Sequence, residues 1–307
     1  MTGLFLALLA TLSVSVPSPT EGLTQSVPVA HAAHIRRMLQ SDGLGATIDA
    51  NLPALQSSLK RAAAKARGEA ELTPEEAARF ETISQPVMNR LKQQLFDYAV
   101  QDYASLNDAD IDALIKANET SLAKRFIARI VGSEAADRST VASYVSETAT
   151  EISTAYAQNR PYAPRYNAPN ASVDDTPENR LLVVTGNAAM CDEVIQNHYI
   201  YAVAGEITDI EFDKLGNGDA TRLRGMFQVG MEDLGNRLKA LKRNEYHFAF
   251  SKEELDQLIA LYSFPAVQTK IRIAQATIPA GRTRNQAAIK ASFDEVLAAF
   301  AEPPTSN

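Results

Sequence analysis

Cys191 and His198 are the residues whose types could supply a nucleophile and its base. A thiol becomes reactive when an imidazole within hydrogen-bonding reach removes its proton. On one helix, seven residues place both side chains on the same face but about 10 Å apart along the axis. A direct dyad therefore fails if the segment is a single helix, and we favour Cys191 as a small apolar residue packed in a helix.

His31 and His34 have the i, i+3 spacing that can bind a metal on a helix. No neighbouring Glu completes a motif of the His-Glu-x-x-His kind. Solvated histidines near the chain terminus are the interpretation that we favour. We predict no metal and no cofactor.

The segment from Asp108 to Glu119 matches a calcium-loop template at several acidic positions. That template needs Gly at its sixth position for a sharp turn, and this chain has Ala113 there. Acidic residues are also expected in a first helical turn, where they complement the helix dipole. We therefore expect a plain helix here and no calcium site.

A second acidic run occupies residues 206–219 around Gly216-Asn217-Gly218. Paired carboxylates can perform acid–base catalysis, but spacing alone does not show that they converge. A solvated loop is the interpretation that we favour. The sequence has no Gly-x-Ser-x-Gly elbow, no phosphate-binding Gly-x-x-x-x-Gly-Lys-Ser/Thr and no dinucleotide-binding Gly-x-Gly-x-x-Gly.

The elements that must position these residues are helices. Ala, Leu, Lys, Glu, Gln and Arg are common, whereas Gly and Trp are scarce. Thr73 and Pro74 are typical of a helix start, and Pro86 predicts a kink or a break further on. We expect another long helix over residues 134–156 after a stop at Gly132, and a helix capped by Asp219 in the second half.

One stretch, Phe250–Pro265, organises the pattern. Ser251 is a good N-cap, and Glu254 three residues on completes a capping box. Phe250 and Leu255 form the matching hydrophobic staple. A weaker copy of this helix start lies at residues 106–115.

The two copies belong to a longer repeat with an offset of about 144 residues. Apolar positions agree along it, as in the pairs Val145 with Ile289, Ile152 with Val296 and Tyr156 with Phe300. We predict an all-α protein made of two related multi-helix bundles from an internal duplication. Repeat unit 1 is expected at 31–157 and repeat unit 2 at 179–302, joined by a Pro-rich linker at 158–178.

The stretch Phe250–Lys270 resembles the core motif of the bacterial domain-of-unknown-function family 2059, present here as two tandem copies, the first degenerate. Tyr262 and Pro265 match that motif, whereas Phe264 replaces its serine and Val267 its glycine. The motif's lysine is shifted by one residue, to Lys270. The resemblance implies an all-helical, exported bacterial protein, and it supplies no catalytic residue.

Charge and the N-terminus indicate where the protein works. The net charge of −7 argues against nucleic-acid binding, because neutralising phosphates requires a basic face. Leu4–Leu12 is a signal-peptide-like apolar core, too short to cross a membrane, so we expect a leader at residues 1–30. Cleavage could fall near Ser18–Gly22 or at Ala30-His31-Ala32. No later stretch could span a membrane.

These patterns predict a periplasmic or secreted, non-enzymatic helical protein that binds an envelope protein or lipid. Phe250, Tyr262 and Pro265 are the candidate interaction residues. A hydrolase using Cys191, His198 or the 206–219 run is the alternative from another class. Carriage of a small apolar ligand beside Tyr246, Phe248, Phe250 and Tyr262 is a third hypothesis.

Overall fold

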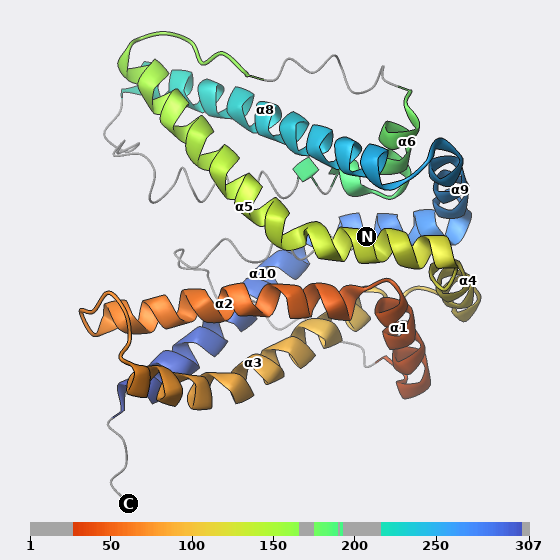
Figure 1. Cartoon of the computed structure of the whole chain (residues 1–307), viewed down its shortest axis with the longest axis horizontal. Helices are drawn as coiled ribbons and strands as arrows, with labels where there is room; N and C mark the ends of the chain where they lie inside the picture. The colour runs from red at the N-terminus through yellow and green to blue at the C-terminus, as the bar shows by residue number, and fades with distance from the viewer. Residues whose placement is uncertain (1–26, 166–174, 190, 193–215, 303–307) are drawn as a thin grey trace, which may run out of the picture. The chain divides into compact units, whose positions relative to one another are not determined.

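The computed structural model describes residues 27–165, 175–189, 191–192 and 216–302 of the 307-residue chain (Figure 1). These residues form helices and their connections without a strand, which confirms the all-α prediction. In chain order the helices are α1 (Val29–Ser41), α2 (Leu44–Ala66), α3 (Pro74–Asp102), α4 (Asp108–Asn118), α5 (Ser121–Ala157), α6 (Pro177–Val184), α8 (Asn217–Ala249), α9 (Lys252–Tyr262) and α10 (Pro265–Ala301).

The described residues divide into two compact units. The central unit comprises residues 120–271, which include α5, α6, α8, α9 and the first turns of α10. The terminal unit comprises residues 27–119 and 272–302, which include α1 to α4 and the rest of α10.

The predicted helix starts are present at both capping boxes. The Thr73 hydroxyl accepts a hydrogen bond from the amide of Glu76, whose carboxylate accepts from the amide of Thr73 in return. Ser251 and Glu254 make the same reciprocal pair at the start of α9. Each box pairs two amides that would otherwise lack a partner in the first turn.

Two local expectations are wrong, and so is one of the two alternatives predicted at Pro86. Pro86 does not break a helix, because α3 continues through it from Pro74 to Asp102, and a kink there stays a prediction. Gly132 does not separate two helices either, since α5 is a single helix of 37 residues. The helix expected to be capped by Asp219 begins three residues earlier, with Gly216 at its N-cap and no side-chain cap.

Helices α5 and α8 pack against each other in the central unit (Figure 1), and their residues form most of its core. Val141, Val145 and Ile152 from α5 lie in one buried cluster with Leu223, Phe227 and Leu234 from α8. Cys191 belongs to this cluster, as does Tyr162 from the segment after α5.

In the terminal unit, the last part of α10 packs on α3. Phe300 meets Phe80 edge-to-face, with ring centroids 5.8 Å apart. The guanidinium of Arg79 lies 5.2 Å from the Phe300 ring centroid. Arg284 of α10 also bonds the half-buried carboxylate of Asp102 at 2.8 Å. These contacts fasten α10 to α3.

The compact units group the helices differently from the predicted repeat. The repeat places residues 134–156 with the first unit and the end of α10 with the second, whereas the contacts place α5 in the central unit and most of α10 in the terminal unit. The duplication itself stays a prediction, because grouping by contact does not test common descent.

Candidate functional site

An aromatic nest contains two of the three candidate interaction residues. The Phe126 ring lies 5.6 Å from Tyr246, 5.9 Å from Phe250 and 5.4 Å from Tyr262, measured between centroids. All four side chains are buried. Pro265, the first residue of α10, is exposed. Phe250 and Tyr262 therefore pack inside the central unit, and their role in partner binding stays a prediction.

Polar bonds hold this nest in place. The Asn187 amide donates to the Tyr246 hydroxyl at 2.7 Å. Burial raises the pKa of Tyr246, so the phenol stays protonated. The Gln268 amide donates to the carbonyl of Tyr262 at 2.8 Å and to that of Val184 at 3.0 Å. These bonds tie α10 to the ends of α6 and α9.

A buried charged cluster joins α5 to α8. Lys242 forms ion pairs with Asp137 and with Glu245, the latter at 3.2 Å. The Ser133 hydroxyl donates to Asp137 at 2.9 Å, and the Lys242 ammonium lies 3.2 Å from that hydroxyl. The side chain of Asp137 is only 3% exposed. Burial alone would lower the pKa of Lys242, but the charges of Asp137 and Glu245 outweigh it and raise that pKa.

Cys191 lies in the same part of the central unit, but its thiol is in the wrong state for catalysis. Burial raises the pKa of Cys191 to about 12, although the charges of Lys242 and Lys239 oppose the shift. Only the thiolate is a good nucleophile. The proposed partner His198 lies outside the described residues, so their mutual distance stays untested.

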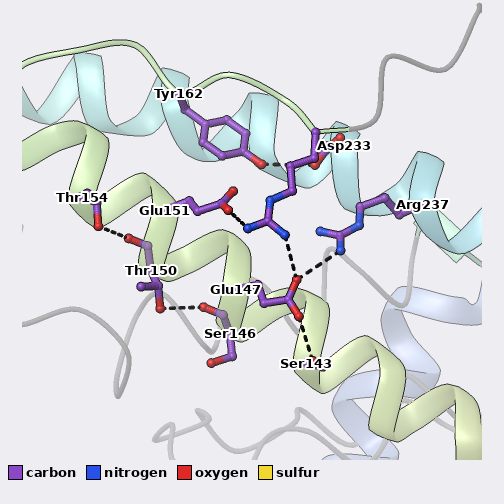
Figure 2. Close-up of polar contacts among 10 residues, drawn as sticks. Ser143, Ser146, Glu147, Thr150, Glu151, Thr154, Tyr162, Asp233 and Arg237 are labelled. Carbon is purple, nitrogen blue, oxygen red and sulfur yellow. Dashed lines mark hydrogen bonds and ion pairs between the residues drawn. The ribbon is translucent and has the colours of Figure 1, made fainter.

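A second polar network follows the seam between α5 and α8 (Figure 2). Glu147 accepts from Ser143 at 3.0 Å and from Arg237 at 3.3 Å. The hydrogen bond from Ser143, followed by the bond from Arg237, lowers the pKa of Glu147. Arg237 also stacks on Tyr144, 3.9 Å from the ring centroid.

The segment after α5 lies across this seam. The Tyr162 hydroxyl donates to Asp233 at 3.1 Å, as Figure 2 shows. Burial, with the Asp233 charge as the next cause, raises the pKa of Tyr162 to about 12. Arg165 pairs with Glu147 at 3.3 Å and also with Glu151. Residues 158–165, predicted as a linker, thus contact both helices.

The His31/His34 pair and the acidic segment that begins at Asp108 lie in contact in the terminal unit. His31 Nδ1 lies 2.8 Å from Asp108 Oδ1, and its Nε2 lies 3.1 Å from the Ala104 carbonyl oxygen. His34 Nδ1 lies 3.2 Å from the same Asp108 oxygen, and its Nε2 lies 2.9 Å from Asp112 Oδ1. The expectation of merely solvated histidines is therefore wrong.

These four side chains are not arranged as a metal centre. Within the described part of the chain, no group of three or more His, Cys, Asp or Glu side chains could hold a metal ion. Asp108 and Asp112 lie in helix α4 instead of a calcium loop. Of the 206–219 acidic run, Asp219 lies in the first turn of α8, and Glu206–Asp213 lie outside the described residues.

Comparison with known proteins returns no match: no family model, no curated protein and no solved structure matches the chain. The resemblance to family 2059 thus stays a prediction. Across the described residues, no helix combines the length and apolar character needed to cross a membrane.

The buried polar groups of the central unit are typical of structural packing and less so of a catalytic site. Its buried ammonium is paired with carboxylates, and its buried phenols and thiol are held in their neutral forms. Sequence reasoning missed the Asp137–Lys242 pair, because 105 residues separate its members and neither has a distinctive neighbour pattern. Helical spacing predicts which face of each helix is buried but not which partner that face meets.

Proposed function

We propose that this protein is an exported helical protein that binds another protein or a lipid of the cell envelope, and that it is not an enzyme. The observation that carries the proposal is the state of Cys191, the sequence's best candidate nucleophile. A thiol with a pKa of about 12 is almost entirely protonated at neutral pH. Binding, unlike hydrolysis, needs no activated group.

The position of α1 supports one of the two leader cleavage sites. Cleavage at Ala30-His31-Ala32 would fall inside α1, which begins at Val29. It would remove the first turn of α1 together with His31, and so the contact between His31 and Asp108. Cleavage near Ser18–Gly22 would leave the helix whole, so the export proposal takes the earlier site.

Phe248 is the side chain that we assign to partner contact. It lies near the end of α8 and is 84% exposed, whereas Phe250, two residues on, is 6% exposed. Aromatic side chains are enriched among the residues that contribute most to protein interfaces. Phe248 therefore replaces Phe250 as the aromatic residue that we assign to partner contact, because Phe250 is buried and Phe248 is exposed.

The test is co-purification of the tagged full-length protein from its native envelope, with mass spectrometry of both proteins and lipids. Phe248→Ser should reduce the recovery of the specific partner by tenfold or more, because truncating a central interface aromatic costs about 2 kcal/mol. Val229→Ser is the matched control, since Val229 is an exposed apolar residue of the same helix, 19 positions away.

Recovery that is equal for Phe248→Ser and the unchanged protein would remove Phe248 from the proposal. A protein that stays in the cytoplasm and recovers no envelope component would overturn the proposed function itself.

A further inference from the structure

The imidazoles of His31 and His34 are each placed between two oxygen atoms. For His31 these are the Asp108 carboxylate and the Ala104 carbonyl, and for His34 they are the carboxylates of Asp108 and Asp112. Carbonyl oxygens and ionised carboxylates only accept hydrogen bonds. A neutral imidazole has a single N–H, so it can satisfy only one of its two neighbours.

Only the doubly protonated imidazolium can donate to both oxygens. The charges then balance, with two imidazolium groups from α1 facing two carboxylates from α4. The histidine side chains are 20% and 23% exposed, so water reaches them only in part. A deprotonated ring would direct a lone pair at an oxygen that lies about 3 Å away, which is unfavourable.

We infer that His31, His34, Asp108 and Asp112 form a proton-dependent clasp that holds α1 against α4 and loosens when the imidazoles lose their protons. The clasp lies beside the apolar contacts of α1, whose Ile35, Met38 and Leu39 are almost completely buried. Loosening it lowers the local stability of α1 and, in the open state, exposes that apolar stripe.

Electrostatics supports the geometry. The hydrogen bond to Asp108 is the largest influence on His34; it raises the pKa above the ordinary value of 6.5, with a further contribution from Asp112 and against the opposing effect of burial. The hydrogen bonds from both histidines lower the pKa of Asp108. A raised histidine pKa stabilises the closed state fully below 6.5, and that contribution disappears as the pH rises through the raised value.

Several other charged groups around α1 pair with one another and not with the imidazoles. Helix α1 packs against α2, α3 and α4. On these elements the ion pairs are Arg36 with Asp97, Arg37 with Glu119, and Lys92 with Asp49. Asp110, in the same turn as Asp108, accepts a hydrogen bond from Asn107. Asp108 and Asp112 are therefore the charges that face the imidazoles.

The test measures hydrogen exchange of α1 in the full-length protein, with α9 of the central unit as the internal reference. After correction for intrinsic exchange, the protection of α1 relative to α9 should fall about threefold or more between pH 6 and pH 8.5. Exposed charge pairs contribute up to about 1 kcal/mol each, which corresponds to about fivefold. NMR of the ring nitrogens should show His34 doubly protonated at pH 6.

Asp108→Asn should lower α1 protection at pH 6 and flatten its pH dependence. Asp110→Asn is the matched control, because it removes the same charge from the same helical turn without touching a histidine. His34→Lys, which stays charged across this range, should keep α1 protected at pH 8.5.

Protection of α1 that does not change with pH in the unmodified protein would overturn the clasp. A pH dependence as large in Asp108→Asn as in the unmodified protein would do the same. If a variant fails to fold, the NMR titration of the unmodified protein decides, since a neutral His34 ring at pH 6 contradicts the inference.

Discussion

At the scale of single residues, the notable feature is how charge is buried. Lys242 brings an ammonium group into a seam where Asp137 is 3% exposed and Glu245 is 13% exposed. Burying an ion pair costs desolvation energy, and replacing it with apolar residues is often neutral. Removing one partner is different, because it leaves an uncompensated buried charge.

Lys242→Met should therefore lower the free energy of unfolding by about 3–5 kcal/mol at pH 7. The methionine keeps the apolar stem but leaves Asp137 and Glu245 facing each other without a cation. The loss should shrink towards pH 4, as Glu245, whose pKa is raised by burial, takes up a proton. Urea denaturation followed by circular dichroism measures both effects.

Lys290→Met is the control, because Lys290 and Asp294 form an exposed pair four residues apart on α10. Exposed pairs of this kind contribute less than about 0.5 kcal/mol. If both variants lost the same free energy of unfolding, burial would not determine how much the ion pairs of Lys242 contribute to stability.

At the scale of elements, the helix starts are the features that sequence predicts well. Ser251 and Glu254 are three residues apart, so their mutual bonds depend on local backbone geometry alone. The helix interiors are harder to predict, because tertiary packing can override the helix-breaking tendency of residues such as Pro86 and Gly132.

Ser251→Ala should destabilise the protein by about 1 kcal/mol, the usual cost of losing an N-cap hydroxyl. Ser263→Ala, at the other end of α9, should change stability by less than about 0.5 kcal/mol, because Ser263 is exposed and bonds only the preceding turn. Thermal or urea unfolding compares the two. A larger loss of stability for Ser263→Ala than for Ser251→Ala would contradict the proposed contribution of the Ser251–Glu254 capping box.

The candidate site is where prediction from sequence stops. The sequence shows the spacing of His31 and His34 and that of Asp108 and Asp112, but Asp108 lies 77 positions after His31. Nothing in either pattern specifies the other as its partner. Phe248 and Phe250 likewise are residues of the same type, two positions apart. Which ring is exposed depends on where α8 ends, since Phe248 lies within the helix and Phe250 follows it.

At the scale of the whole molecule, the grouping of helices departs from the predicted repeat for a related reason. Helices α5 and α10 have apolar residues at equivalent positions of the predicted repeat, such as Tyr156 and Phe300. From the sequence alone, either helix could therefore pack in either unit. Local pattern therefore cannot say which unit each helix completes. In the structure, Phe300 packs on Phe80 of the terminal unit.

Truncation after Ile271 should therefore damage the beginning of the chain. Without residues 272–302, α1 to α4 lose the contacts of Phe300 and Arg284, and we expect their amides to lose most of their protection from hydrogen exchange. The amides of α5, α8 and α9 should stay protected. Truncation after Glu302 is the control, and loss of protection confined to α5 and α8 would contradict this grouping.

The terminal unit also has a consequence for the order of biosynthesis. Its first part leaves the ribosome roughly 150 residues before α10, and at synthesis rates of about 5–20 residues per second that interval is about 8 to 30 s. During this time α1 to α4 lack the helix that completes their core. The terminal unit therefore cannot finish folding until α10 emerges, whereas the central unit is complete once Ile271 has been made, so the half of the molecule that begins first is the half that folds last.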